Sequence, residues 1–276
     1  TYNNKVHRLW KRTSEKLMLK IGFIGSGNMA TAMINGLLHT ELFIENDIYI
    51  YDEDTLKTNE LKSKYDINIS SNNIELVKEV DVIVFAVKPY IVKHVVEEIK
   101  EYVDDSKLII SIAAGITIKT IETYFNKQVK VVRTMPNTAV LVNEGMTAIT
   151  FNNNITVSDQ LISINIFDSF GKSIVLEETH FDMFTSICAS SPAFVYMFIE
   201  ALSLCGVEDG LNKEDVYKMV AQSVLGSAKM VLKTEIEPLV LKDRVCTKGG
   251  TTIEGVKVLE KHHFIDVIKE AAIKTK

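Results

Sequence analysis

The stretch KIGFIGSGNMATAMINGL, residues 20–37, decides the fold predicted from this sequence. It opens with a short apolar run typical of a strand, continues through the glycine turn Gly25–Ala30, and ends with small and apolar residues at helical spacing. In such a unit Gly25 permits a tight turn, Gly27 lets a pyrophosphate approach the backbone, and Ala30 lets helix and strand pack closely. The helix start then offers N–H groups to phosphates. The stretch favours dinucleotide binding, although a glycine turn alone also fits a structural role.

Composition bounds the class of protein. The chain has 276 residues, is 46% hydrophobic and carries a formal net charge of -5, which suits one large or two ordinary domains. An acidic balance argues against nucleic acid or an anionic membrane as main partner, and no apolar run approaches the roughly 18 residues of a membrane span. Cys188, Cys205 and Cys246 lack metal or disulfide spacing, and the first two are expected in the core. We expect a cytoplasmic protein without a metal site.

The first residues differ in character from the rest. Residues 1–17 carry several Lys and Arg side chains but lack the apolar centre of a signal peptide. We expect them to be a disordered extension, with a short basic helix as the alternative.

Strand and helix patterns alternate along residues 18–177. Apolar strand-like runs recur at 47–52, 81–86, 108–112 and 129–133, with helical patterns such as 90–101 between them. This alternation predicts an α/β fold, a Rossmann-like doubly wound sheet. Ligands of such sheets lie beyond the carboxyl ends of the strands, so the segments following these strands should line one crevice. These segments are Lys88-Pro89, Ala113-Ala114 and Pro136-Asn137. Edge strands are expected at 146–150 and 173–176, around a helix at 157–170. From Glu178 only helical patterns remain, which predicts a second, all-helical domain over 178–276.

Asp52 bears on the choice of cofactor. It ends the second strand about 25 residues after Gly27, where an acidic side chain meets the adenosine ribose. Glu53 and Asp54 follow, and this acidic run would repel the 2′-phosphate of NADP. We therefore favour NADH; the alternative is that Glu53 and Asp54 only begin the next helix.

Several motifs in order resemble those of one family, the pyrroline-5-carboxylate reductases, which perform the last step of proline biosynthesis. The resemblance extends from residue 19 to about 270. Its carriers are GFIGSGNMA (22–30), AVKP (86–89), AAG (113–115), RTMPNT (133–138), SSPAFVYMFIEAL (190–202), GSAKM (226–230) and KGGTTIEGV (248–256).

The resemblance implies an NAD(P)H-dependent oxidoreductase that reduces 1-pyrroline-5-carboxylate to L-proline. It also implies a helical C-terminal domain that interlocks with a second copy, giving a homodimer and possibly a decamer. The implied cofactor residues are Ile24, Gly25, Ser26, Gly27, Asn28, Met29, Asn73, Ala86, Val87, Lys88, Pro89, Ile112, Ala113 and Ala114, to which we add Asp52. The implied substrate residues are Val245, Thr247, Thr251 and Thr252, with Glu235 as a further candidate.

Hydride addition to a C=N bond suits these residue types. It needs a protonated iminium, an anchor for the substrate carboxylate and a face-on nicotinamide. The Thr252 hydroxyl can orient and donate to the ring nitrogen, and backbone N–H groups at Gly249, Gly250 and Thr251 can bind the carboxylate. Read alone, this loop is equally a helix N-cap supplied by threonine.

Lys88 is the second candidate catalytic residue. After a buried strand it could stabilise charge near the nicotinamide or act as an acid, as lysines do in β-hydroxyacid dehydrogenases. The alternative is a solvated lysine beside Pro89, the residue that fixes the turn.

Two loops depart from the family pattern and keep other functions open. Ser191 and Lys248 stand where many members have glycine and proline, and Lys248 either helps bind the substrate or faces solvent. These departures motivate one alternative, a catalytically weak paralogue that acts by binding a partner. A β-hydroxyacid dehydrogenase is another, against which the Gly-Gly-Thr-Thr loop argues.

Overall fold

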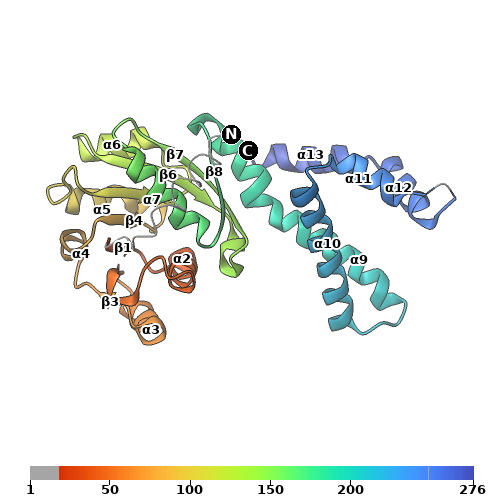
Figure 1. The fold of residues 1–276 in the computed structure, drawn as a ribbon, viewed down its shortest axis with the longest axis horizontal. Coiled ribbons are helices and arrows are strands. Elements are labelled where there is room, and N and C mark those ends of the chain that lie inside the picture. The colour runs from red at the N-terminus through yellow and green to blue at the C-terminus, as the bar shows by residue number, and fades with distance from the viewer. Residues whose placement is uncertain (1–18, 248) are drawn as a thin grey trace. The chain divides into compact units, whose positions relative to one another are not determined.

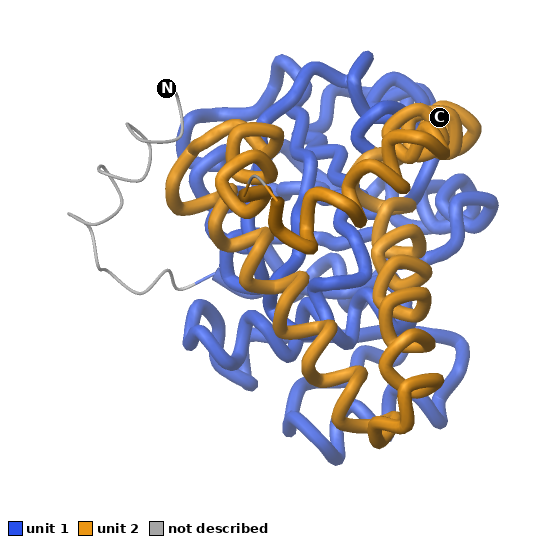
Figure 2. Tube along the Cα trace, turned by 90° about the vertical axis from the view of Figure 1, so that its right-hand side faces the viewer, with its two compact units in different colours: residues 1–184 blue, residues 185–276 orange. Residues whose placement is uncertain are grey.

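The computed structural model describes residues 19–247 and 249–276, so the expected extension 1–17 and Lys248 lie outside the described residues. The chain divides into two compact units, called here unit 1, up to Phe184, and unit 2, Thr185–Lys276. They are coloured blue and orange in Figure 2. Unit 1 is α/β and unit 2 is all-helical, which confirms the predicted fold class.

Unit 1 is built on one 8-stranded sheet with the order β3-β2-β1-β4-β5-β6-β7-β8 (Figure 1). Strands β1 to β6 run parallel, β7 pairs antiparallel with β6, and β8 pairs parallel with β7. This is the predicted doubly wound sheet with two strands added at one edge. The strands are β1 Ile21–Ile24, β2 Ile48–Tyr51, β3 Asn68–Ile69, β4 Val82–Phe85, β5 Leu108–Ser111, β6 Lys130–Pro136, β7 Gly145–Phe151 and β8 Gly171–Val175.

Helices cover both faces of this sheet, because successive strand residues point to opposite sides. In β4, Val82 and Val84 join the buried cluster of α2 and α7, whereas Ile83 and Phe85 join that of α4, α5 and α6. The helix expected over 90–101 is shorter, because Pro89 begins a 3₁₀ turn before α5. The helices are α2 Asn28–His39, α3 Thr55–Tyr65, α4 Asn73–Glu79, α5 Val92–Ile99, α6 Ile118–Phe125 and α7 Val157–Asp168, with 3₁₀ turns η1 Glu45–Asp47, η2 Pro89–Ile91 and η3 Thr138–Val142.

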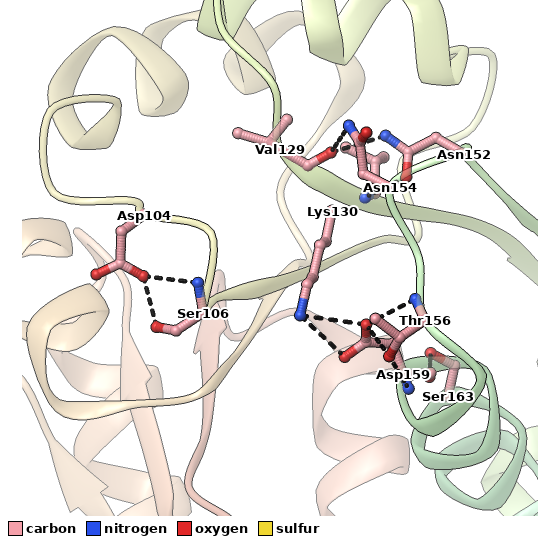
Figure 3. A network of polar contacts seen from close by, with 10 residues as sticks. Asp104, Ser106, Val129, Lys130, Asn152, Asn154, Thr156, Asp159 and Ser163 are labelled. Atoms are coloured by element: carbon pink, nitrogen blue, oxygen red, sulfur yellow. Dashed lines mark hydrogen bonds and ion pairs between the residues drawn. The ribbon is translucent and has the colours of Figure 1, made fainter.

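A polar network fixes where α7 begins (Figure 3). The Thr156 hydroxyl accepts a hydrogen bond from the Asp159 N–H at 3.2 Å, and the Asp159 carboxylate accepts one from the Thr156 N–H at 2.9 Å. This reciprocal pair is a capping box, which satisfies two N–H groups at a helix start. The Lys130 ammonium lies 3.2 Å from the same carboxylate, so the start of β6 and the start of α7 are joined.

The last residues of unit 1 are anchored to its sheet. They form the turn η4 Glu178–His180 and the short helix α8 Phe181–Phe184. The Glu178 carboxylate accepts from the Arg133 guanidinium and from the Ile118 N–H, both at 2.9 Å. The Phe181 ring lies 4.6 Å from the Arg133 guanidinium. Arg133 therefore holds this segment through a charge pair and an aromatic contact.

Unit 2 has almost no buried core as a single chain. Among its described residues Val216 is the only buried apolar side chain, whereas Met197 and Leu232 are 72% and 79% exposed. Helices this exposed do not bury enough apolar surface to offset their loss of chain entropy. The elements are the π-helical turn η5 Thr185–Ser190 and helices α9 Ser191–Glu208, α10 Lys213–Thr234, α11 Pro238–Val245, α12 Thr251–Lys261 and α13 Phe264–Lys274.

Two sequence expectations about this region are wrong. The helical stretch Glu178–Glu208 contains an 18-residue window of mean hydropathy 1.5, so one apolar run does reach spanning length. By length and composition alone such a helix fits a protein interface as well as a membrane. Cys188 is half-buried and Cys205 is exposed rather than in the core, because this part of the described chain leaves its apolar helices uncovered.

Candidate functional site

The fold requires glycine at position 25. Its φ is +105°, and a Cβ there would lie 2.7 Å from the Ala86 carbonyl oxygen at the end of β4. The Gly25 N–H donates to the Tyr51 carbonyl at 2.8 Å. The turn is thus pressed between the ends of β4 and β2, where only glycine fits.

Gly27 has no such requirement. Its φ is −68°, and a Cβ there would meet nothing within 4 Å. Gly27 is the N-cap of α2, so the N–H groups of Asn28, Met29 and Ala30 have no carbonyl partner within the helix. The bare backbone and the positive end of the helix dipole together suit a phosphate group.

Asp52 binds Ser26, the residue between Gly25 and Gly27 in the turn. Its Oδ2 accepts hydrogen bonds from the Ser26 N–H at 2.7 Å and the Ser26 hydroxyl at 2.8 Å, and its Oδ1 accepts one from the Asp54 N–H at 2.9 Å. Burial alone would raise the pKa of the Asp52 carboxyl, but these hydrogen bonds outweigh it and hold the pKa below its usual value.

A cavity of about 660 Å³ opens at the carboxyl ends of the strands in unit 1. It is lined by the candidate cofactor residues except Ser26, which is only 4% exposed and faces Asp52. The lining candidates are Ile24, Gly25, Gly27, Asn28, Met29, Asp52, Asn73, Ala86, Val87, Lys88, Pro89, Ile112, Ala113 and Ala114. Pro136 lines the cavity as the crevice argument predicts, whereas the Asn137 side chain accepts from the Met146 N–H.

Sequence reasoning missed the contribution of two helices. Lys57 of α3, with His94 and Glu98 of α5, also lines the cavity. The signal was present in α5, where His94 and Glu98 stand four residues apart on a helix whose other face is valine and isoleucine.

His94 and Glu98 of α5 hold the Asn73 side chain in place. The Glu98 carboxylate accepts from the Asn73 amide nitrogen at 2.6 Å and lies 3.0 Å from the His94 imidazole. Asn73 is 7% exposed, and within the described residues its Oδ1 has no hydrogen-bond partner. Because a carboxylate only accepts, it fixes the amide so that Oδ1 remains the acceptor for another group.

Lys88 follows β4, where its backbone is extended and Pro89 begins the next turn. Its side chain is exposed and lines the cavity. Within the described residues it has no ion-pair partner, so its charge is available to a bound group.

The candidate substrate residues all belong to unit 2. Val245 ends α11, and the loop that follows contains Thr247 and Gly249, the latter with φ +77°. The Gly250 N–H donates to the Thr247 carbonyl at 3.0 Å, and Gly250 is the N-cap of α12.

Threonines 251 and 252 occupy the first turn of α12 and are exposed. The loop does form the N-cap of α12, as the alternative expects, but Gly250 and not a threonine occupies the N-cap position. Neither threonine side chain caps the helix, so both hydroxyls remain available. Glu235 lies apart from this loop in the chain, as the exposed left-handed residue that ends α10. Across the described residues no group of three or more His, Cys, Asp or Glu side chains could hold a metal ion.

Comparison with known proteins gives matches over most of the chain. A family model described as pyrroline-5-carboxylate reductase dimerisation matches residues 178–276, and one described as NADP oxidoreductase, coenzyme F420-dependent, matches residues 20–115. The curated pyrroline-5-carboxylate reductase of Escherichia coli (strain K12) is 41% identical over 255 residues, which cover 92% of this chain and 95% of that protein.

Two solved structures are similar over nearly the full length. The pyrroline carboxylate reductase of Plasmodium falciparum with NADP bound has a TM-score of 0.85 and 34% identity, covering 95% of this chain and 97% of that one. The pyrroline-5-carboxylate reductase of Coxiella burnetii has a TM-score of 0.87 and 31% identity, covering 93% and 96%.

Proposed function

The chain belongs to the pyrroline-5-carboxylate reductase family, and on this premise we propose that it transfers a hydride from NAD(P)H to the C=N bond of 1-pyrroline-5-carboxylate, giving L-proline. The observation that carries the proposal is the cavity of unit 1, where the glycine turn and the strand ends meet in a chain 41% identical to a curated reductase. Nothing in the structure favours the alternative of a paralogue that acts only by binding a partner.

The glycine turn and its surroundings fit a dinucleotide. Gly27 leaves open space where a Cβ would stand, and the start of α2 offers N–H groups to the pyrophosphate. The cavity is lined by Ile24 at the end of β1 and by Ile112 and Ala113 just after β5. These apolar residues suit the nicotinamide half of the dinucleotide, because they exclude water from it.

The loop at the start of α12 supplies the substrate contacts in this proposal. The backbone N–H groups of Gly249, Gly250 and Thr251 bind the carboxylate. The Thr252 hydroxyl orients the ring, and its oxygen accepts a hydrogen bond from the N–H of the protonated imine. The cofactor, when bound, supplies the hydride to the imine carbon, and the proton already on the nitrogen stays there, so the product is a neutral amine before it protonates again. Lys88 places a positive charge at the cavity wall, where it counters the negative charge of the nucleotide.

For the cofactor we propose NADH over NADPH. Glu53 lines the cavity, and its carboxylate opposes a 2′-phosphate. Lys57 lines it too, but its ammonium lies 3.0 Å from the Asp54 carboxylate, which offsets much of its charge.

Unit 2 is proposed to pair with unit 2 of a second copy. Its helices expose Met197 and Leu232, and the matching family model is described as a dimerisation domain. A homodimer, or a decamer assembled from such dimers, would cover this surface. No disulfide joins the three cysteines, which suits a reducing cytoplasm, and we propose neither nucleic acid nor a membrane as partner.

A direct assay tests the function. Purified full-length protein should oxidise NADH, and NADPH more slowly, when 1-pyrroline-5-carboxylate is added, and proline should accumulate in equal amount. A chain that turns over neither nucleotide with this substrate is not a reductase of this kind.

A further inference from the structure

Asp52 uses most of its acceptor capacity on the protein itself. A carboxylate has about four acceptor positions, and three of them are taken by the Ser26 N–H, the Ser26 hydroxyl and the Asp54 N–H, at 2.7 to 2.9 Å. A sugar diol held by a carboxylate normally needs both oxygens, and here Oδ2 already carries two hydrogen bonds. The contact with the adenosine ribose expected for this position is therefore left with one acceptor position, on Oδ1.

The same contacts also fix the orientation of the glycine turn. The Gly25 N–H donates to the Tyr51 carbonyl and the Ser26 N–H donates to Asp52, so the end of β2 and the residue after it hold the first two residues of the glycine turn. Ser26 is 4% exposed and does not line the cavity. The N–H groups left to face a pyrophosphate are those from Gly27 onward, and their direction follows from where Ser26 is held.

We propose that Asp52 is a positioning residue that fixes the glycine turn through Ser26, and that it acts equally on NADH and NADPH. This rests on the proposed function only in taking a nicotinamide dinucleotide as the ligand. Discrimination at the ribose 2′ position then belongs to Glu53 and Lys57, whose side chains line the cavity beside it.

Ser26→Ala separates the two roles without changing any charge. It removes the hydroxyl bond to Asp52 and leaves the backbone. If Asp52 fixes the turn, the Kd of NADH and that of NADPH should rise by the same factor, about 5-fold, as expected for a lost bond to a charged acceptor. If Asp52 binds the ribose directly, Ser26→Ala should leave both values unchanged, and the proposal is overturned.

Asp52→Asn and the double variant complete the design. Asp52→Asn should raise the Kd of NADH about 10-fold, and adding Ser26→Ala to it should change that value no further, because both remove one interaction. Additive losses contradict the proposal. Glu60→Gln, at an exposed position of α3 outside the cavity lining, is the charge-matched control and should leave the Kd of both nucleotides within 2-fold. Glu53→Gln should improve NADPH binding.

The readouts keep this proposal distinct from the proposed function. Kd is measured from nicotinamide fluorescence without any substrate. The KM for NADH should rise in Ser26→Ala while kcat at saturating NADH is retained, whereas a merely structural defect would lower the active fraction and hence kcat. A wild-type protein that binds neither nucleotide defeats the proposed function; a wild type that binds both, with Ser26→Ala unaltered, defeats only this inference.

Discussion

The two units treat their apolar residues in opposite ways. Unit 1 buries two continuous clusters, one on each face of its sheet. Unit 2 is helical throughout, yet Val216 is its one buried apolar side chain among those the structure describes. A sheet flanked by helices completes its core within one chain, whereas a helical hairpin has a free side that needs another surface. Unit 1 therefore buries a core of its own, whereas the exposed apolar side chains of unit 2 would be covered in the proposed homodimer.

The largest expected effect comes from truncating one phenylalanine in each unit. Phe85 is 0% exposed in unit 1, and Phe198 is 40% exposed in unit 2. Phe85→Ala should lower the free energy of unfolding by about 3–5 kcal/mol at every protein concentration, because it leaves a cavity. Phe198→Ala should lower the free energy of unfolding by less than this in dilute protein, and by more at higher protein concentration, where the chains assemble. Urea unfolding at several concentrations checks this. Equal, concentration-independent losses would mean that unit 2 has a core of its own.

The next effect separates the chemistry of the two units. Thr252→Val should lower kcat roughly 100-fold, the scale of losing one group that orients the substrate, while the Kd of NADH stays unchanged because the cavity belongs to unit 1. Thr252→Ser keeps the hydroxyl and should retain most activity. Steady-state kinetics with nucleotide binding measured in parallel test the prediction, and a weakened NADH affinity in the valine variant would contradict it.

A smaller effect concerns assembly. Leu202 of α9 is 46% exposed and Leu56 of α3 is 81% exposed. If exposure in unit 2 marks an interface, Leu202→Lys should weaken self-association at least about 10-fold, since it places a charge in an apolar contact. Leu56→Lys should leave it unchanged. Sedimentation of both variants tests this prediction. Weaker self-association in Leu56→Lys but not in Leu202→Lys would place the interface on unit 1.

The two units also differ in how much of their structure could be predicted from the sequence. The period-2 and period-3.6 patterns of unit 1 are local, so the strands, the glycine turn and the crevice could be predicted from them. The role of Asp52 could not, because its bonds to Ser26 join residues 26 positions apart. His94 and Glu98 were missed since they act across α5 on Asn73. In unit 2, the core position expected for Cys205 is wrong because the described helices leave most of their apolar side chains exposed.

The smallest expected effect is a pH dependence confined to the Asp52 contacts. The folded protein holds the pKa of Asp52 below its usual value through the Asp54 and Ser26 hydrogen bonds, which outweigh burial. The folded state therefore favours the ionised form, so its stabilisation is complete above the unfolded pKa of about 4 and is lost as the pH falls through the folded value. The difference in urea midpoint between wild type and Asp52→Asn should stay constant from about pH 7 to 5 and shrink below about pH 4. Glu53→Gln removes the same charge without those bonds and should give a smaller difference throughout. If the difference in urea midpoint between wild type and Asp52→Asn grows as the pH falls, the ionised carboxylate strains the turn. The stability of the turn would then have to come from Gly25 and its close contact with the end of β4.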